Sequence, residues 1–421
     1  MNESKIRELD KALIEASKGI RVLKALAWPA GTEADFIKGW SCGNPRLPDV
    51  QIQGPNLSSN IEALDAIAAQ ADPGHPVGIF LRETAMSYAD AGRMLESVGT
   101  PDFTRYSIQI YGRPDRQYKN QQVSPVDGAK FFLSVTDDLL GNPQFPTTVA
   151  KISDEDFAKW LRAEMDEFFT DDEVKVVLDP DMSSKALAGS KRIRLRAGAV
   201  FSQLDKDQLL HHEAFVHTAT QLNGKKQKNL RSLGLGAPRT TRTQEGIAVL
   251  AELITGSIDI SRLRRVALRV IAVTMALEGA DFIEVFRFFL DAGQTVEESV
   301  RSTQRIFRSG DVHGGIVFTK DAVYLQGLIE VHTFMRLAIR DNRSNLIHSL
   351  FAGRLTLADS LRLDRMFESG WLIQPAYIPG WASDSMRLAA MMAYSAFMTN
   401  IQIDNLKLER AIEFEEELRM A

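Results

Sequence analysis

Three of the seven histidines in the chain, His211, His212 and His217, fall within seven consecutive residues that also contain Glu213. Imidazole and carboxylate groups this close together are typical of metal sites and of proton-transfer sites. The pattern H-E-x-x-x-H is one residue longer than the H-E-x-x-H of zinc peptidases. In a regular α-helix, side chains five residues apart point about 140° apart, against about 40° for residues four apart. We therefore predict a π-bulge or a break between His212 and His217.

A hydrolytic zinc site needs three protein ligands and an open position for water. His212 and His217 would supply two ligands, and Glu213 would be placed to act as the general base. The third ligand has to come from elsewhere, and Glu245 is one candidate because it opens the next predicted helix. The rival candidates are the lone histidines His313, His332 and His348. Glu252, seven residues after Glu245 on the same helix face, would suit a supporting hydrogen bond to a ligand.

The elements that must position these residues are mostly helical, so we predict a helix-dominated α+β fold. Alternation of apolar and basic residues predicts strands at 174–179 and 191–196, with Ile193 and Leu195 on one face of the second strand. Ser202 and Asp205 predict a capping box at the start of the histidine helix. A short strand is expected at 107–111 and an irregular segment at 28–55. Helices are expected at about 3–26, 58–71, 84–98, 153–169, 202–224, 244–254, 259–278, 281–291, 295–307, 321–340, 343–351, 357–368, 385–400 and 403–419.

In zincin-type peptidases a strand is followed by the metal-binding helix and then by a helix that carries a glutamate. The predicted elements 191–196, 202–224 and 244–254 have this order, so we expect a zincin-like core with a small sheet before the metal-binding helix. We predict an N-terminal, mostly helical region at 1–150 and a catalytic core with C-terminal helices at 151–421.

Composition narrows the class of protein. Cys42 is the only cysteine, which excludes an intramolecular disulfide and cysteine-rich zinc modules. The N-terminal segment is amphipathic and charged, unlike a signal peptide, and no apolar stretch is long enough to span a bilayer. We therefore expect a cytoplasmic protein with no membrane partner.

Charge is unevenly distributed along the chain. Residues 182–242 contain twelve Lys or Arg and three Asp or Glu, a net charge of +9, whereas the rest of the chain carries −14. We call 182–242 the basic region. Such a field would attract anionic ligands, although these side chains could equally well solvate loops and strand faces. Aromatic residues are not interleaved with the basic ones, so we expect no nucleic-acid partner.

Three sequence blocks carry a resemblance to a known family. HEAFVHTATQLNG, TQEGIAVLAE and FTKDAVYLQG, in this order, resemble the signature of the microtubule-associated tyrosine carboxypeptidase family. The bacterial branch of this family is named after a Q-E-G-L-A motif and is labelled flavohaemoglobin expression-modulating. The likeness includes VGTPDF and IYGRP upstream and extends over about 10–400.

The resemblance implies a zinc-dependent carboxypeptidase in which His212, His217 and Glu245 hold the metal and Glu213 is the catalytic glutamate. Two positions depart from the family pattern. Ile247 replaces a leucine, which is a conservative change, and Phe215-Val216 replaces a smaller pair, which would narrow the pocket. The tubulin tail, the substrate of eukaryotic members, is not implied for a chain of the bacterial branch.

The third block also suggests residues that could hold a substrate. Lys320 and Tyr324 are four residues apart and would share a helix face, where they could bind a C-terminal carboxylate or a developing oxyanion. Arg239 and Arg242, just before the glutamate helix, are alternative carboxylate anchors. Each of these four residues could instead be structural.

The preferred reading is a zinc peptidase that removes C-terminal residues, possibly acidic ones, from peptides or proteins. A non-enzymatic regulatory or adaptor protein with a structural metal site is the main alternative, and a metal-dependent amidohydrolase acting on a non-peptide is a third.

Overall fold

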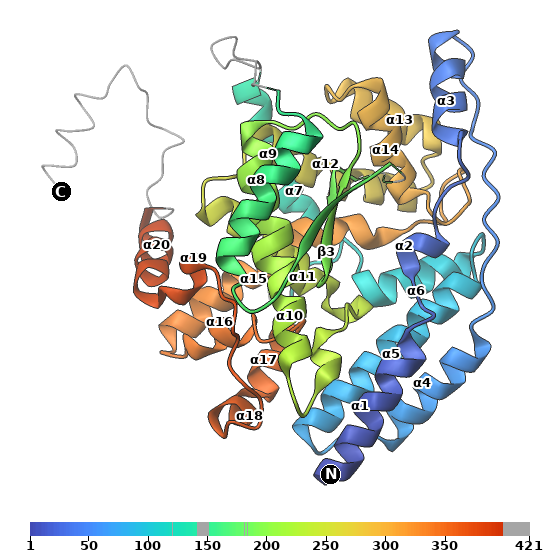
Figure 1. Ribbon diagram of the computed structural model, residues 1–421. Coiled ribbons are helices and arrows are strands. Elements are labelled where there is room, and N and C mark those ends of the chain that lie inside the picture. The colour runs from blue at the N-terminus through green and yellow to red at the C-terminus, as the bar shows by residue number, and fades with distance from the viewer. Residues whose placement is uncertain (120, 141–150, 181, 183, 399–421) are drawn as a thin grey trace, which may run out of the picture.

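The computed structural model describes residues 1–119, 121–140, 151–180, 182 and 184–398 (Figure 1). Helices dominate this part of the chain, and a small three-stranded sheet accompanies them. The predicted helix-dominated α+β class is therefore confirmed. The zincin-like core and the division of the chain at 150 stay predictions, and the helix expected at 403–419 lies outside the described residues.

The N-terminal helices form one end of the molecule. Helices α1 (Glu3–Ser17), α4 (Ser58–Gln70) and α5 (Pro76–Glu96) lie side by side in Figure 1, and their apolar faces are buried together. The helix expected at 3–26 is interrupted after Ser17, and a short helix α2 (Val22–Ala25) follows. This interruption matters because residues 20–24 line the pocket described below.

Two predictions for the N-terminal part are wrong. The segment expected to be a strand at 107–111 belongs to helix α6 (Pro101–Tyr111), which begins with proline in its first turn and ends at Gly112, whose φ is 91°. Phe103, Ser107 and Tyr111 follow one another at four-residue spacing and are all buried. The buried side chains of this segment therefore repeat with the period of a helix and not with that of a strand.

The stretch expected to be irregular at 28–55 contains helix α3 (Thr32–Ser41). Phe36 and Trp40, four residues apart, pack edge-on against Phe286, with ring centroids 5.0 and 4.7 Å away. Tertiary contacts between aromatic rings therefore hold a helix in a segment whose local glycine and proline content predicts none.

The sheet lies just before the metal helix in the sequence, as predicted. Its strands are β1 (Lys175–Asp179), β2 (Ala186–Leu187) and β3 (Arg192–Arg196), in the order β1-β3-β2. β1 runs parallel to β3, and β2 pairs with β3 in the antiparallel sense, so β2 is an edge strand. Ile193 and Leu195 are fully buried, which confirms the predicted alternation along β3.

Helices α11 (Thr241–Ile254) and α15 (Val323–Arg340) pack at close range, and α11 also contacts the helix that carries His212 and His217. Two glycines make this approach possible. A Cβ atom added to Gly246 would lie 2.3 Å from the carbonyl oxygen of Gly327, and one added to Gly327 would lie 2.2 Å from that of Arg242. Glu245 precedes the first glycine directly, so this close packing fixes its position against the start of α15.

The C-terminal segment is tied to the end of the metal helix. The Asn223 side-chain amide donates to the carbonyl oxygens of Phe351 and Tyr377, at 2.8 and 2.7 Å, and accepts from the backbone N–H of Tyr377. The remaining helices agree with the predicted segments within a few residues, except that α7 and α19 were not predicted and that the segment predicted as one helix at 357–368 forms two, α17 and α18. They are α7 (Pro125–Leu140), α8 (Asp154–Phe168), α12 (Ile260–Leu277), α13 (Phe282–Asp291), α14 (Val296–Ile306), α16 (Asn345–Ser349), α17 (Leu357–Arg362), α18 (Asp364–Glu368), α19 (Gly380–Ser383) and α20 (Ser385–Met398).

Candidate metal centre

The helix that carries the histidines begins at the predicted capping box. The Ser202 hydroxyl accepts a hydrogen bond from the backbone N–H of Asp205, and the Asp205 carboxylate accepts one from that of Ser202. These bonds satisfy two of the free N–H groups at the start of α9 (Gln203–Leu209).

The next segment, Leu210–Thr218, is a π-helix, and it continues into helix α10 (Ala219–Lys226). The wider turn brings His212 and His217 to the same side, with ring centroids 4.9 Å apart. The predicted distortion between the two histidines is thus confirmed.

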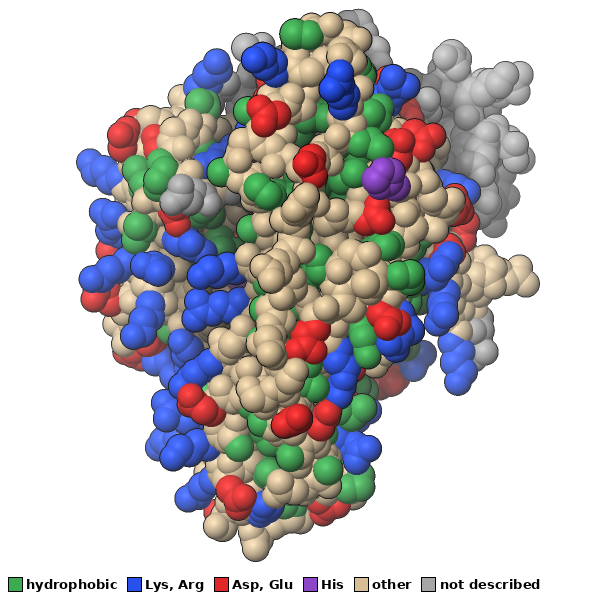
Figure 2. Space-filling view, turned by 90° about the vertical axis from the view of Figure 1, so that its right-hand side faces the viewer, with side chains coloured by type: hydrophobic (Ala, Val, Ile, Leu, Met, Phe, Trp, Pro, Cys, Tyr) green, Lys and Arg blue, Asp and Glu red, His purple; other side chains and the backbone are tan. Residues whose placement is uncertain are grey.

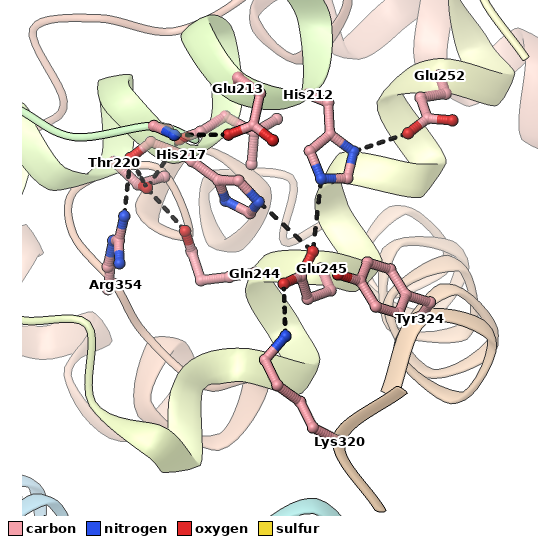
Figure 3. Close-up of polar contacts among 12 residues, drawn as sticks. His212, Glu213, His217, Thr220, Gln244, Glu245, Glu252, Lys320, Tyr324 and Arg354 are labelled. Atoms are coloured by element: carbon pink, nitrogen blue, oxygen red, sulfur yellow. Dashed lines mark hydrogen bonds and ion pairs between the residues drawn. The ribbon is translucent and has the colours of Figure 1, made fainter. Parts of the chain in front are cut away.

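His212, His217 and Glu245 offer three ligand atoms that lie within 4.8 Å of one another (Figure 3). The Glu245 Oε2 atom is 3.4 Å from His212 Nε2 and 3.5 Å from His217 Nε2. Ligands bound to zinc at 2.0–2.1 Å in a tetrahedron lie about 3.3 Å apart, so this spacing suits an ion between them better than direct hydrogen bonds. Nitrogen and carboxylate ligands without thiolate fit zinc in an open site.

The second ring nitrogen of His212 faces Glu252. Nδ1 lies 2.7 Å from Glu252 Oε1, and Arg262 donates two hydrogen bonds to the same carboxylate at 3.1 Å each. A proton on Nδ1, directed at the carboxylate, leaves the Nε2 lone pair facing His217 and Glu245. Glu252 therefore lies where a supporting hydrogen bond to a metal-ligand candidate was expected.

The charges of His212 and Glu245 stabilise each other. Burial opposes a charge on His212, but the carboxylates of Glu245 and Glu252 outweigh it and raise the pKa of His212 to about 10. Burial also opposes ionisation of Glu245, yet Lys320 and the two histidines hold the pKa of Glu245 well below its usual range. In the metal-free protein a proton bound by His212 would therefore supply part of the positive charge that a divalent cation would bring to these carboxylates.

Glu213 lies beside this cluster and is held from the sheet side. The backbone N–H of Ala188, just after β2, donates to Glu213 Oε2 at 2.8 Å (Figure 3). No partner for Oε1 is found among the described residues. One carboxylate oxygen is therefore anchored, and the other is available to a ligand.

A pocket of about 380 Å³ opens next to the cluster. Glu213, His217 and Glu245 contribute to its wall, together with side chains from the N-terminal helices, from the loop before α11 and from the segment after α16. The other residues of the lining are Ile20, Arg21, Val22, Leu23, Lys24, Tyr88, Tyr111, Leu187, Ala188, Gly236, Ala237, Pro238, Thr240, Thr241, Gln244, Lys320 and Arg354. Polar and charged side chains thus make up about half of the pocket wall, and apolar side chains make up the rest.

Of the four predicted substrate-binding residues, Lys320 and Tyr324 lie near Glu245, whereas Arg239 and Arg242 bind other partners. Lys320 lines the pocket and donates to Glu245 Oε1 at 3.2 Å. Tyr324 lies behind it, with its ring 5.3 Å from the Lys320 ammonium and its hydroxyl 3.4 Å from Arg305. Arg239 forms ion pairs with Asp359 and Glu83.

Arg242 donates to the backbone carbonyl of Tyr111 and to Glu330. Like Arg239, it does not belong to the pocket lining that the structure describes. The rival histidines also lie elsewhere. His313 is exposed and bonded to Asp311, His348 lies near Ser385, and neither they nor His332 belong to the metal-ligand cluster found among the described residues.

Basic side chains gather along the left-hand edge of the face shown in Figure 2. In the part of the chain that the structure describes, however, none of the Lys or Arg residues of the basic region lines the pocket. The cations at the pocket are Arg21, Lys24, Lys320 and Arg354. Composition alone did not single out Arg21, Lys24 or Arg354, because all three lie outside the basic region and outside the three sequence blocks.

His212, His217 and Glu245 form a cluster of three possible metal ligands, and Glu213 lies beside it in the pocket wall. Together these residues define a candidate hydrolytic metal site. The sequence model of the microtubule-associated tyrosine carboxypeptidase family matches residues 35–400. The chain belongs to this family, as its three sequence blocks predict.

Other comparisons add little. No curated protein matches the chain. Among solved structures, a crystal structure titled as a lipoprotein from Colwellia psychrerythraea is similar, with a TM-score of 0.42 and 13% identity. The match covers 82% of this chain and 64% of that one, so the chain spans less than two thirds of that protein. No helix among the described residues has both the length and the apolar character needed to cross a membrane.

Proposed function

We propose that this protein is a zinc-dependent carboxypeptidase that removes C-terminal residues from peptides or proteins. The observation that carries the proposal is the position of Glu213, which lines the same pocket as His217 and Glu245. A structural metal site needs no such group, whereas hydrolysis needs a base beside the ion and room for a substrate.

Zinc would be held by His212, His217 and Glu245, and when bound it would supply a Lewis acid that polarises the scissile carbonyl and lowers the pKa of water. The protein fixes this donor set from both sides. Glu252 orients His212 from one side, and Lys320 holds Glu245 Oε1 so that Oε2 faces the histidines. We expect zinc binding to release the additional proton of His212, because a histidine ligand binds the ion as neutral imidazole.

Glu213 is proposed to accept the proton of the attacking water and to pass it to the leaving amine. Its hydrogen bond with the N–H of Ala188 keeps the carboxylate next to the pocket without occupying its second oxygen. The same segment offers a place for the substrate backbone. β2 is an edge strand, and Leu187 and Ala188 line the pocket, so an extended peptide could add to this edge.

Metal analysis and a peptide-cleavage assay on one purified preparation test the proposal. We expect about one zinc per chain, and loss of single C-terminal residues from a pool of acetylated hexapeptides, followed by mass spectrometry. Glu213→Gln should keep the zinc and lower the cleavage rate about 10²- to 10⁴-fold, because the amide cannot accept the proton. Glu368→Gln, an exposed glutamate remote from the pocket lining, is the matched control.

The two measurements distinguish a zinc peptidase from a regulatory protein with a structural metal site. Zinc without any cleavage would favour the regulatory protein with a structural metal site. Wild-type turnover in Glu213→Gln would remove Glu213 from the mechanism.

A further inference from the structure

Arg354 reaches the metal pocket from a part of the chain that the sequence motifs do not include. It follows helix α16, and its Nη2 atom donates to the carbonyl oxygen of His217 at 3.3 Å (Figure 3). Its side chain lines the pocket together with Glu213, His217 and Glu245. The guanidinium therefore lies beside the proposed reaction centre.

No ion pair to Arg354 within 4.0 Å is found among the described residues, and its Nε is buried without a hydrogen-bond partner. Two half-buried arginines near the cluster, by contrast, form direct ion pairs, Arg239 with Asp359 and Arg262 with Glu252. Glu213 and Glu245 stabilise the charge of Arg354 only through space, and a carboxylate brought by a ligand would supply the direct ion pair that the guanidinium lacks among the described residues.

The position of Arg354 is fixed by its surroundings. Its backbone N–H donates to the carbonyl oxygen of Leu233 at 2.7 Å. A Cβ atom added to Gly236 would lie 2.5 Å from Arg354 Nη1, so the glycine provides the space in which the guanidinium lies. A fork-shaped donor held in place before a ligand binds gives affinity with little loss of side-chain entropy.

A second unused donor lines the same pocket. Gln244 is 4% exposed, its Oε1 accepts from the Thr220 hydroxyl at 2.8 Å, and its buried Nε2 has no partner among the described residues. Arg354 and Gln244 together offer unsatisfied N–H groups to whatever fills the pocket. Lys320 is less suited to a ligand because its ammonium already binds Glu245.

We infer that Arg354 is the residue that binds the free α-carboxylate of the substrate, assisted by the amide of Gln244, and so restricts the site to chain ends. The inference rests on the proposed peptidase function and deepens it. A carboxylate matches the paired N–H groups of a guanidinium, whereas the neutral carbonyl of an internal peptide bond would leave the charge unpaired.

Matched peptides test this inference. A pool of acetylated hexapeptides that vary only at the last residue is prepared once with a free C-terminus and once as the amide. The wild type should cleave the free acids at least about 100-fold faster, in kcat/KM, than the amides. Arg354→Gln should lower kcat/KM for the free acids about 10²- to 10³-fold, mostly through KM, and should remove the preference over amides.

Two further variants control for structural effects. Arg354→Lys keeps the charge but not the paired donors, and it should retain part of the preference. Arg105→Gln removes an exposed charge whose partner is Asp102, and it should change neither constant. Zinc content is measured in each variant, because Arg354 also touches the carbonyl group of His217.

A binding measurement avoids dependence on turnover. In zinc-loaded Glu213→Gln protein, calorimetry should show that the free-acid pool binds more tightly than the amide pool, and that adding Arg354→Gln abolishes the difference. Equal cleavage of acids and amides by the wild type would overturn the inference and leave a zinc endopeptidase. An undiminished acid preference in both Arg354 variants would overturn it as well. Absence of cleavage together with absence of zinc would instead count against the proposed function.

Discussion

Glu245 and Glu252 lie two turns apart on helix α11, and they meet opposite nitrogens of the same imidazole, that of His212. Glu245 Oε2 is 3.4 Å from Nε2, and Glu252 Oε1 is 2.7 Å from Nδ1. One helix therefore supplies both a metal-ligand candidate and the group that sets the tautomer of another ligand.

This relationship predicts the effect of removing the charge of Glu252. Glu252→Gln should keep the hydrogen-bond geometry but weaken zinc binding about 10- to 100-fold, because the imidazole loses its anionic partner. Competition with a chromophoric chelator measures the affinity, and Glu62→Gln, an exposed glutamate on α4, is the control. Because Arg262 would lose its counter-charge, the unfolding midpoint of the metal-free variant is recorded alongside. Unchanged zinc affinity in a folded variant would refute the supporting role.

Zinc binding should also fail when one imidazole is removed. His217→Ala leaves His212 and Glu245 as the remaining pair, which is too few ligands for a stable site. We expect zinc content after dialysis to fall close to zero. His313→Ala, at an exposed histidine outside the cluster, should retain full occupancy. Full zinc in His217→Ala would show that the metal lies elsewhere.

The metal-free protein should lose stability as pH rises from about 6.5 to about 10. Burial lowers the pKa of His212, but the carboxylates of Glu245 and Glu252 outweigh it and raise that pKa to about 10 from the 6.5 of a free imidazole. Because the folded state binds the proton more tightly than the unfolded state, the contribution is full below pH 6.5 and is lost as pH passes through 10. Thermal unfolding of metal-free wild type is compared with that of His212→Asn. The difference between their midpoints should shrink over this window, and a difference that grows would contradict the assignment.

Peptides with acidic residues near their C-terminus should be preferred at low salt. Arg21 and Lys24 are exposed side chains that line the pocket, and no acidic group accompanies them in the segment from 20 to 24. Attraction between exposed charges is worth about 1 kcal/mol per pair and is screened as the Debye length falls to about 3 Å at 1 M salt. The ratio of kcat/KM for acidic over neutral peptides should therefore decline with added sodium chloride. Arg21→Gln with Lys24→Gln should remove the salt dependence, and a ratio independent of both salt and substitution would exclude this role.

Much of the candidate site could be predicted because its residues are close together in sequence. The spacing of His212 and His217 indicated a distorted helix, since a regular one would separate their side chains. Glu245 was one of several candidates for the third ligand, and the family resemblance singled it out, whereas helical periodicity placed Glu252 on the same helix face. Arg354 could not be found in this way, because it approaches His217 across 137 residues and belongs to no periodic pattern.

The errors in the fold have the same origin. Helix α3 depends on contacts between Phe36, Trp40 and Phe286, which are distant in sequence. Arg239 and Arg242 looked like free cations next to the glutamate helix, but their partners Asp359 and Glu330 lie far along the chain. Local patterns report the elements and their faces, whereas the pairing of charges depends on the tertiary arrangement.

The π-helix at Leu210–Thr218 explains how H-E-x-x-x-H can place two histidines together although it is one residue longer than H-E-x-x-H. A residue inserted into an α-helix would rotate every later side chain by about 100° around the axis. Here the wide turn accommodates the additional residue locally, so the histidines converge while Asn223, further along, still meets Phe351 and Tyr377. Histidine motifs of unequal length can thus superimpose in space. Searches that demand strict spacing will pass over such sites, whereas a search on side-chain geometry will find them.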